Sequence, residues 1–454
     1  MLEPDLTAVA TAGFSPRGWL RMVRSPGAVM RHVRGDSLLR NSLFIMTTTV
    51  VNSAFGFAFW VVAARLFPTE VVGLTAALIA AGTIIALLAS LGVGATLIQS
   101  LPEQRNSAGW SLTFWAGLLT AVATSVAIGG VLFLVLPLVS GHFSVLHRPA
   151  YAAVMAVGSV AMTVGAVLDY SFLAQRAAGN MLSRNSVVAA GKVLAALLLT
   201  VVAGHNALVL LGAWALAAAV GIGLGVGLLI RRVNFLRLPR PSALARRAQE
   251  LRSRLVGHQL VSMGAALLPY LLPLLVTARL SATDNAYFYT TWMMAGIFLI
   301  IAPAVSQSLF AEGAHSPHDV LVKARSALTI IAVLIAPCMV VILVMGGVLL
   351  SAFGPAYERH SLGLLHVVVL AAIPDVITNV YVAVLRVEGR LRTAAGLNLG
   401  MGVGILALSW MFLPMLGISA VGWAWLAMQL SGCAFIVFDL SHRQPHVMPQ
   451  EATR

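Results

Sequence analysis

The stretch RNSLFIMTTTVVNSAFGFAFWVVAAR, residues 40–65, decides the fold because its frame returns in the second half of the chain. Arg40 and Arg65 enclose 24 uncharged residues, and 214 positions later Arg254 and Arg279 again enclose 24. Short groups beyond the frame also match at this offset: Ala64-Arg65-Leu66 with Ala278-Arg279-Leu280, Thr69-Glu70 with Thr283-Asp284, and Ala81-Gly82 with Ala295-Gly296. A repeat of this length predicts two similar helical lobes.

The composition predicts an all-α polytopic membrane protein. The chain is 59% hydrophobic and 10% charged, with a mean hydropathy of +0.92, whereas soluble domains carry about 25% charged residues. A membrane-spanning helix needs about 20 mostly apolar residues. The residue-by-residue alternation of a transmembrane β-barrel is not found in this sequence.

We predict about twelve transmembrane helices. The expected spans are residues 40–65, 71–99, 108–138, 150–175, 183–203, 207–230, 255–279, 284–310, 323–351, 361–387, 391–413 and 416–440. Prolines at positions 137, 303, 337 and 374 predict kinks. Pro269 and Pro273 predict that span 255–279 is bent or unwound, unlike span 40–65.

The distribution of positive charge predicts the orientation. Arginine and lysine residues in alternate loops number 24 on the side of the two termini and four on the other, which are Arg65, Arg148, Arg279 and Arg359. Cytoplasmic loops carry the excess of positive charge. Both termini are therefore expected in the cytoplasm, and the protein is expected in the inner membrane of the cell. The net charge of +14 therefore reflects membrane topology, and we predict no nucleic-acid partner.

Five segments follow from this topology. Residues 1–37 form a basic cytoplasmic arm, either an interfacial helix on anionic lipid or a disordered tail that only fixes topology. Two six-helix lobes, residues 38–230 and 255–440, flank a basic cytoplasmic linker at 231–254, and residues 441–454 form a cytoplasmic tail. Six spans return the chain to its starting side, so the lobes are parallel repeats.

Three motifs resemble those of the polysaccharide transporter family. They are Asn41-Ser-Leu-Phe44, Trp60-Val-Val-Ala-Ala-Arg-Leu-Phe-Pro-Thr-Glu-Val-Val-Gly73 and Leu91-Gly-Val-Gly-Ala-Thr-Leu-Ile98. This family contains the Wzx-type oligosaccharide flippases of the multidrug/oligosaccharidyl-lipid/polysaccharide exporter superfamily. The resemblance implies two lobes around a central cavity that work by alternating access. The implied substrates are polyprenyl-diphosphate-linked sugars. Gln99-Ser100-Leu101-Pro102 departs from the family, whose members often carry a basic residue before Leu-Pro.

Four arginines are candidates for binding the diphosphate. Arg65 and Arg279 lie at the outer ends of two equivalent spans, where they either receive diphosphate or serve as anchors paired with Glu70 and Asp284. Arg40 and Arg254 would form the matching cytoplasmic ring.

Two polar residues lie on the helices that line the cavity in the family fold. Asn52 and Gln259 would hydrogen-bond sugar hydroxyls or, alternatively, neighbouring helices.

Charged residues inside the spans are the second group of candidates, because intramembrane charge costs about 2.5–3.5 kcal/mol at a helix centre. Lys192 and Asp169 are expected at similar depth, either as a structural ion pair or as a phosphate-facing lysine and a titrating carboxylate. Asp375 and Asn379 share a helix face after Pro374 and either hold a proton or cation or form a solvated cavity wall.

Catalysis is not expected, because the chain has no Walker A motif and no catalytic constellation. Cys338 and Cys433 lie in apolar segments and are interpreted as core residues, so we predict no metal or cofactor. The expected function is a flippase for a lipid-linked oligosaccharide in cell-envelope polysaccharide biosynthesis. Alternatives are a proton- or cation-coupled multidrug antiporter, a lipid II flippase, and a membrane scaffold that recruits glycosyltransferases or a polymerase.

Overall fold

A computed structural model of the chain describes residues 37–104, 107–233, 239–255, 260–315 and 320–442. Within them the chain is helical: α4 (Ser37–Leu66), α5 (Thr69–Ser100), α6 (Ser107–Val139), a 3-10 helix η1 (Gly141–His147), α7 (Pro149–Ala174), α8 (Ala178–Ala203), α9 (Ala207–Val233), α10 (Pro241–Leu255), α11 (Leu260–Arg279), α12 (Ala282–His315), α13 (Val320–Ser351), α14 (Pro355–Val387), α15 (Leu391–Leu416) and α16 (Ser419–Ser441). Eleven of the twelve expected spans fall on helices of 23 residues or more, and the expected span 255–279 overlaps the 20-residue helix α11.

Local chemistry sets many of the helix boundaries. Pro149 and Pro355 occupy the first positions of α7 and α14, where the missing amide hydrogen costs nothing. Gly204 and Gly417 follow α8 and α15 with positive φ angles of 80° and 58°, a backbone region that glycine adopts without strain. Asp284 begins α12 in a capping box with Ser281, whose hydroxyl donates to the carboxylate at 2.6 Å.

Ten helices of the described chain are long and apolar enough to cross a membrane. Counting the bent helix α12 as one span would give eleven; it bends by 42° between Gly296 and Ile301, just before Pro303, where a kink was predicted. The described apolar part of α11, Ala266–Arg279, is shorter, and α11 stays helical through Pro269 and Pro273, so it is not unwound there. A multi-pass membrane protein is confirmed, and the count of twelve crossings stays a prediction.

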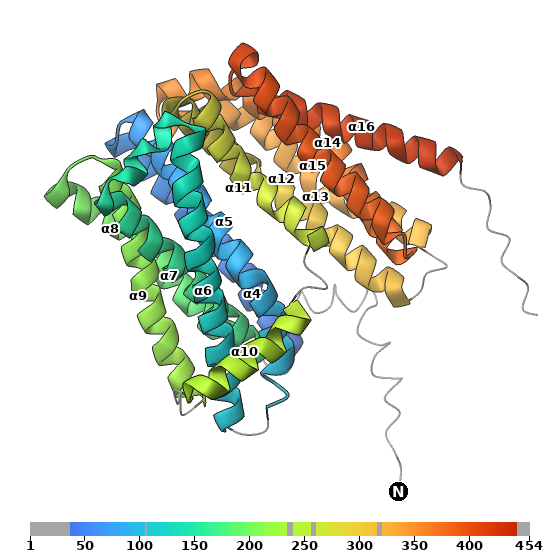
Figure 1. Cartoon of the computed structure of the whole chain (residues 1–454). Coiled ribbons are helices and arrows are strands. Elements are labelled where there is room, and N and C mark those ends of the chain that lie inside the picture. Colours follow the sequence, from blue (N-terminus) through green and yellow to red (C-terminus); the bar gives the residue numbers. More distant parts are fainter. Residues whose placement is uncertain (1–36, 105–106, 234–238, 256–259, 316–319, 443–454) are drawn as a thin grey trace, which may run out of the picture.

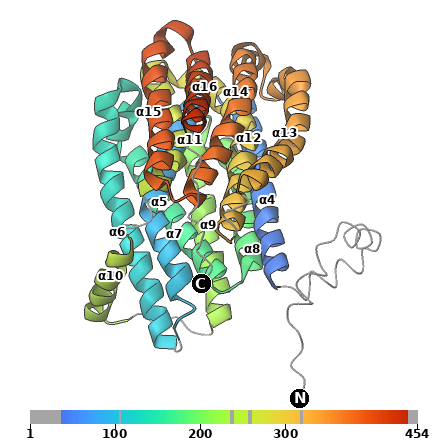
Figure 2. The same ribbon diagram turned by 90° about the vertical axis from the view of Figure 1, so that its right-hand side faces the viewer.

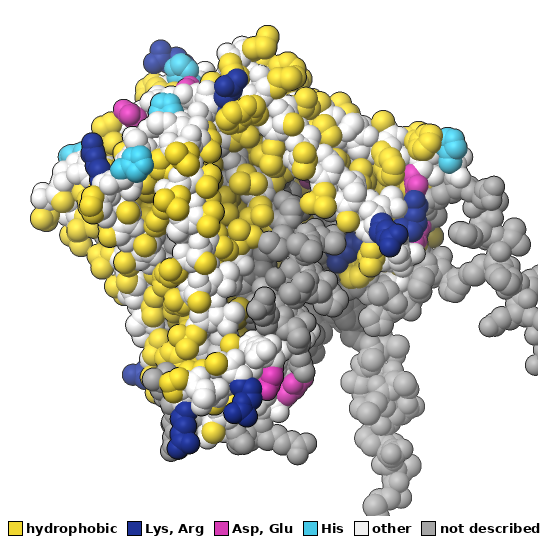
Figure 3. Space-filling model, in the orientation of Figure 1, with side chains coloured by type: hydrophobic (Ala, Val, Ile, Leu, Met, Phe, Trp, Pro, Cys, Tyr) yellow, Lys and Arg dark blue, Asp and Glu magenta, His cyan; other side chains and the backbone are white. Residues whose placement is uncertain are grey.

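The outer surface of the helices is apolar. Val201 and Val202 on α8 are about 85% exposed, and so is Leu138 on α6. Figure 3 shows hydrophobic side chains over the visible face of both lobes, with arginine and lysine side chains near the helix ends. Such a surface fits the hydrocarbon of a bilayer, in which only helices satisfy the backbone internally.

The helices form two groups that meet near the top of Figure 1 and diverge toward its bottom, α4–α9 (the first lobe) and α11–α16 (the second lobe). Figure 2 shows the same grouping from the side. The largest buried cluster contains residues of both lobes, such as Trp60 and Phe67 with Phe288 and Trp292. Three other clusters lie within single lobes. Among the described side chains, the lobes therefore share a buried core at one end.

We call this the joined end, and it is where α4 and α11 finish and α5 and α12 begin. Backbones touch there: a Cβ atom on Gly73 of α5 would lie 1.6 Å from the carbonyl oxygen of Ala282. Asn285 donates from its side-chain amide to the Gly73 carbonyl at 2.8 Å, and the rings of Trp60 and Tyr289 lie 4.7 Å apart. The family-like motif that ends at Gly73 thus forms the contact between the lobes.

The opposite end is the arginine-rich end. There α10, within the segment expected as a linker, lies across the end of α6 (Figure 1). Arg247 of α10 donates to the Thr113 hydroxyl of α6 at 3.3 Å and pairs with Glu250 at 2.8 Å. The linker is therefore largely a helix attached to the first lobe.

Candidate functional site

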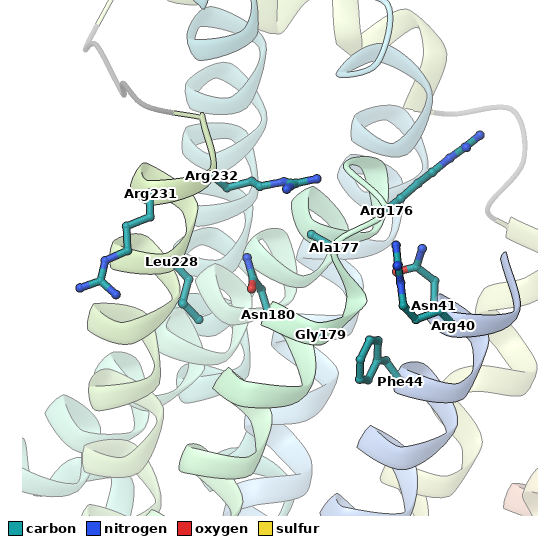
Figure 4. A pocket seen from close by; sticks show the side chains of 10 residues that line it. All are labelled: Arg40, Asn41, Phe44, Arg176, Ala177, Gly179, Asn180, Leu228, Arg231 and Arg232. Atoms are coloured by element: carbon teal, nitrogen blue, oxygen red, sulfur yellow. The ribbon is translucent and has the colours of Figure 1, made fainter. Parts of the chain in front are cut away.

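A cavity of about 350 Å³ opens at the arginine-rich end of the first lobe. Three elements build it: the start of α4, the turn between α7 and α8, and the end of α9. Its lining residues are Arg40, Asn41, Phe44, Arg176, Ala177, Gly179, Asn180, Leu228, Arg231 and Arg232 (Figure 4). Four are arginines, and none of these ten described residues is acidic. We call it the arginine pocket.

The walls of the arginine pocket are joined through Asn41. Its side-chain oxygen accepts a hydrogen bond of 3.1 Å from the backbone amide of Ala178, in the first turn of α8. Arg232 extends from α9 toward the turn before α8, while Arg176 and Arg231 point outward from the rim (Figure 4). The amino end of α8 carries a partial positive charge. The pocket therefore presents one sign of charge on long side chains that can turn toward an anion.

Arg176 has an unusual backbone for a residue with a side chain. Its φ angle is +53°, in the left-handed region that favours glycine. It closes α7 in a Schellman motif, in which the amide of Arg176 donates to Leu173 and that of Ala177 to Phe172. The second lobe closes α14 with the same two bonds, but Gly389 occupies the left-handed position. Arginine at this position of the first lobe is not required by helix termination.

Most of the arginine pocket escaped sequence analysis. Arg40 was a candidate, whereas Arg176, Arg231 and Arg232 were interpreted only as topological charges. The signal was present in the loop Arg176-Ala-Ala-Gly179 and in the pair Arg231-Arg232. Their proximity to Arg40 depends on how α4, α8 and α9 pack.

Asp169 of α7 is held by Arg184, which corrects the expected pairing with Lys192. Two bonds of 2.6 and 3.0 Å join the Arg184 guanidinium to the carboxylate, and the Asn185 amide adds a third at 3.1 Å. Glycines make room for this arginine, because a Cβ atom on Gly165 or Gly225 would lie within 2.8 Å of it. Arg184 was expected at the start of span 183–203 and counted among the cytoplasmic charges, but α8 begins at Ala178 and carries it into the helix packing.

Lys192 lies two turns further along α8. Its ammonium group is 5.9 Å from the centre of the buried Phe59 ring of α4. No acidic partner of Lys192 is found among the described residues. The alternative of a structural pair with Asp169 is therefore wrong, and a phosphate-facing Lys192 stays a prediction.

Asp375 of α14 is buried at 5% exposure and is surrounded by amides. Gln429 of α16 donates to one carboxylate oxygen at 2.7 Å and Asn379 to the other at 3.0 Å. Thr378 donates to the Gln429 side-chain oxygen at 2.6 Å, which orients that amide. The shared face of Asp375 and Asn379 is confirmed, and a solvated wall does not fit this burial. Whether the group holds a proton or a cation stays a prediction.

Arg65 and Arg279 do not pair with Glu70 and Asp284, contrary to the anchor interpretation. The Arg65 guanidinium donates to the carbonyl oxygens of Ser351 and Ala352, both at 2.8 Å, in the other lobe. Arg279 donates to the Trp410 carbonyl at 3.3 Å within its own lobe and lies 5.1 Å from that indole ring.

The remaining candidates are less informative. Asn52 is exposed on α4 and, within the described structure, makes no side-chain hydrogen bond, so helix pairing through it is not observed. The side chain of Arg254, although it belongs to α10, and all of Gln259 lie outside the described residues, as does the basic arm up to residue 36. Their expected roles stay predictions.

The second lobe holds a polar cluster that sequence analysis missed. Arg390, between α14 and α15, binds Asp439 of α16 through two bonds of 2.6 and 2.7 Å. Tyr381 donates to the same carboxylate, and Glu388 lies 3.9 Å from the guanidinium. Hydrogen bonding to Asp439 raises the pKa of Arg390. This arginine is neutralised within its own lobe.

Comparison with known proteins finds a family match over the first lobe and most of the linker. Residues 38–252 match a family described as "Polysaccharide biosynthesis protein". No curated protein shows a significant match to the sequence.

Solved structures define the fold of the whole chain. A multidrug resistance MATE family transporter of the MOP superfamily, in an inward-facing conformation, superimposes with a TM-score of 0.67 over 86% of this chain and 94% of that one, at 14% identity. The lipid II flippase MurJ, in an inward closed conformation, gives 0.68 over 88% of this chain and 87% of that one, at 11% identity. At these identities the likeness concerns the fold alone.

An outward-facing structure has a similar fold as well. This MATE family transporter gives a TM-score of 0.55 over 89% of this chain and 95% of that one, at 14% identity. The chain is a multi-pass membrane protein whose fold is similar to that of the MOP-superfamily transporters, and residues 38–252 match the polysaccharide biosynthesis protein family, in agreement with the predicted resemblance.

Proposed function

We propose that this protein moves a polyprenyl-diphosphate-linked oligosaccharide across the cytoplasmic membrane, for cell-envelope polysaccharide biosynthesis. The arginine-rich end faces the cytoplasm, with both termini on that side. The substrate loads there between the lobes, and the lobes then rock to expose it at the joined end. The polyprenyl tail remains in lipid throughout.

The observation that carries this proposal is the arginine pocket. A diphosphate presents several anionic oxygens, which guanidinium groups bind through paired hydrogen bonds. Four arginines with no acid among the described lining residues fit such a group. The pocket also lies in the lobe that matches the polysaccharide family. A pocket for a cationic drug would need the opposite charge.

Export of the glycan by pocket variants tests the proposal. In a strain deleted for the gene, the triple variant Arg176→Gln, Arg231→Gln and Arg232→Gln should export the glycan about tenfold more slowly. This factor corresponds to a rise of about 1.4 kcal/mol in the activation free energy of transport. The lipid-linked precursor should accumulate on the cytoplasmic side while the protein reaches the membrane normally. Arg392→Gln, an exposed arginine at the same end of the second lobe, is the matched control. Unchanged export by the triple variant would contradict the proposal.

A proton- or cation-coupled antiporter is the second candidate, favoured by the buried Asp375 and its amide partners. Asp375→Asn keeps the shape of this group and removes its ability to take up a proton. In an antiporter, that variant should abolish drug efflux from cells, and the arginine-pocket variants should not. Glycan export that fails in the pocket variants, without any drug efflux by the wild type, excludes this candidate.

A further inference from the structure

Arg65 makes a contact between the lobes that its repeat counterpart does not make. The residue ends α4 in the first lobe, and its guanidinium reaches the last turn of α13 in the second. Its Nε donates to the Ala352 carbonyl and its Nη2 to the Ser351 carbonyl, both at 2.8 Å. Phe57 of α4 packs against Phe353 beside it, with ring centres 5.2 Å apart. The contact therefore exists only while the joined end is closed.

The acceptors of Arg65 resemble a phosphate in their hydrogen-bonding geometry. The last carbonyls of a helix have no partner within it and carry partial negative charge. Two such oxygens side by side offer the guanidinium a pair of acceptors, as two oxygens of a phosphate do. When the lobes part, the side chain loses both acceptors at once. An arginine deprived of acceptors at a cavity mouth is a ready site for an anion.

Arg279 differs because lobe separation leaves its partners in place. Its carbonyl and indole contacts both come from Trp410 of α15, in the same lobe. The two arginines occupy equivalent positions in the repeat. Only the one in the first lobe changes its surroundings when the joined end opens.

We propose that Arg65 is a phosphate-binding residue of the joined end, occupied in this conformation by the carbonyl oxygens of α13. Opening exchanges those oxygens for a phosphate of the substrate, so arrival of the diphosphate stabilises the open state. The identity of that phosphate rests on the proposed function. The exchange itself depends only on the contacts described above.

The distance between the lobes, measured by electron spin resonance in lipid nanodiscs, tests this exchange. Labels are placed at Ser144 and Arg359, both exposed, after Cys338 and Cys433 are replaced by alanine. Arg65→Gln should raise the open population roughly tenfold, because the closed state loses two hydrogen bonds from a charged group. Arg279→Gln should leave the distance distribution as in the wild type.

Three additives identify the ligand: inorganic pyrophosphate, undecaprenyl diphosphate, and extra phosphatidylglycerol. Pyrophosphate and undecaprenyl diphosphate should shift the wild type and the Arg279 variant toward the open state, and should not shift Arg65→Gln further. An Arg65 variant as closed as the wild type overturns the inference. So does one that responds fully to pyrophosphate. An equal shift by phosphatidylglycerol would assign the phosphate to bulk lipid and contradict the substrate as its source. Because none of these readouts requires transport, failure of the proposed function would be seen separately.

Discussion

At the arginine-rich end, the two lobes terminate equivalent helices with the same pair of backbone hydrogen bonds but with different residues. In the first lobe the left-handed position holds Arg176, beside a pocket lined by no described acid. In the second lobe it holds Gly389, and the next residue, Arg390, is bound by Asp439. The duplicated fold has thus kept its geometry, while the arginine pocket that we propose as the anion site lies in the first copy.

The buried charges differ in the same direction. In the first lobe Asp169 is neutralised by a cation, Arg184, whereas in the second lobe Asp375 is surrounded by neutral amides. A charge pair is fixed in its ionisation, while a carboxylate with neutral donors can exchange a proton with less disturbance. The proposed anion site lies in the first lobe, and the uptake of a proton or cation by Asp375 in the second lobe stays a prediction.

The largest effect is expected from breaking the buried pair. Arg184→Met leaves the Asp169 carboxylate buried without its cation, which costs about 3–5 kcal/mol. Gln429→Met in the second lobe removes one amide donor from Asp375 and should cost about 1–3 kcal/mol. Thermal unfolding in detergent, followed by tryptophan fluorescence, measures both. The double variant Asp169→Leu with Arg184→Met should regain most of the stability. Equal losses in the two lobes would contradict the distinction between charged and neutral partners.

An acid placed in the arginine pocket should make the first lobe resemble the second. Asn180→Asp is nearly isosteric and lies in the first turn of α8, where negative charge stabilises a helix. The new carboxylate should compete with the substrate for the arginines and slow glycan export roughly tenfold. This factor corresponds to a rise of about 1.4 kcal/mol in the activation free energy of transport. Asn206→Asp, before α9 at the other end of the lobe, is the control in the same export assay. Faster export by Asn180→Asp would contradict the proposal that the arginine pocket binds an anionic group of the substrate.

The smallest effect concerns the left-handed position. Arg176→Gly should relieve the strained backbone and stabilise the protein by about 1 kcal/mol, and Gly389→Arg should destabilise it by about 1–2 kcal/mol. Thermal unfolding gives both values, and glycan export should fall in the first variant despite its greater stability. An Arg176→Gly protein that is less stable than the wild type would show that the arginine contributes to structure instead.

Sequence alone predicted the elements because their signals are local. The frame from Arg40 to Arg65 lies within the membrane helix α4, residues 260–279 of the second frame form α11, and Pro303 lies just after the bend of α12. The partner of Asp169 was not predictable in this way. The expected depth in the membrane favoured Lys192 as the partner of Asp169. The start of α8, however, was placed five residues late, and the glycines that make room for Arg184 come from two other helices. Rotation about a helix axis and the fit of a long side chain are tertiary properties.

The attachment of α10 to α6 has a mechanical consequence. Because the helix moves with the first lobe, the connection between the lobes is only the chain from Leu255 to Leu260. Five Cα–Cα steps of 3.8 Å reach at most about 19 Å, whatever path they follow. This short connection limits how far the two lobes can separate on its own side of the molecule, whatever conformation they adopt. Under the proposed function, the sugar chain would therefore pass on the side of the lobes away from this connection.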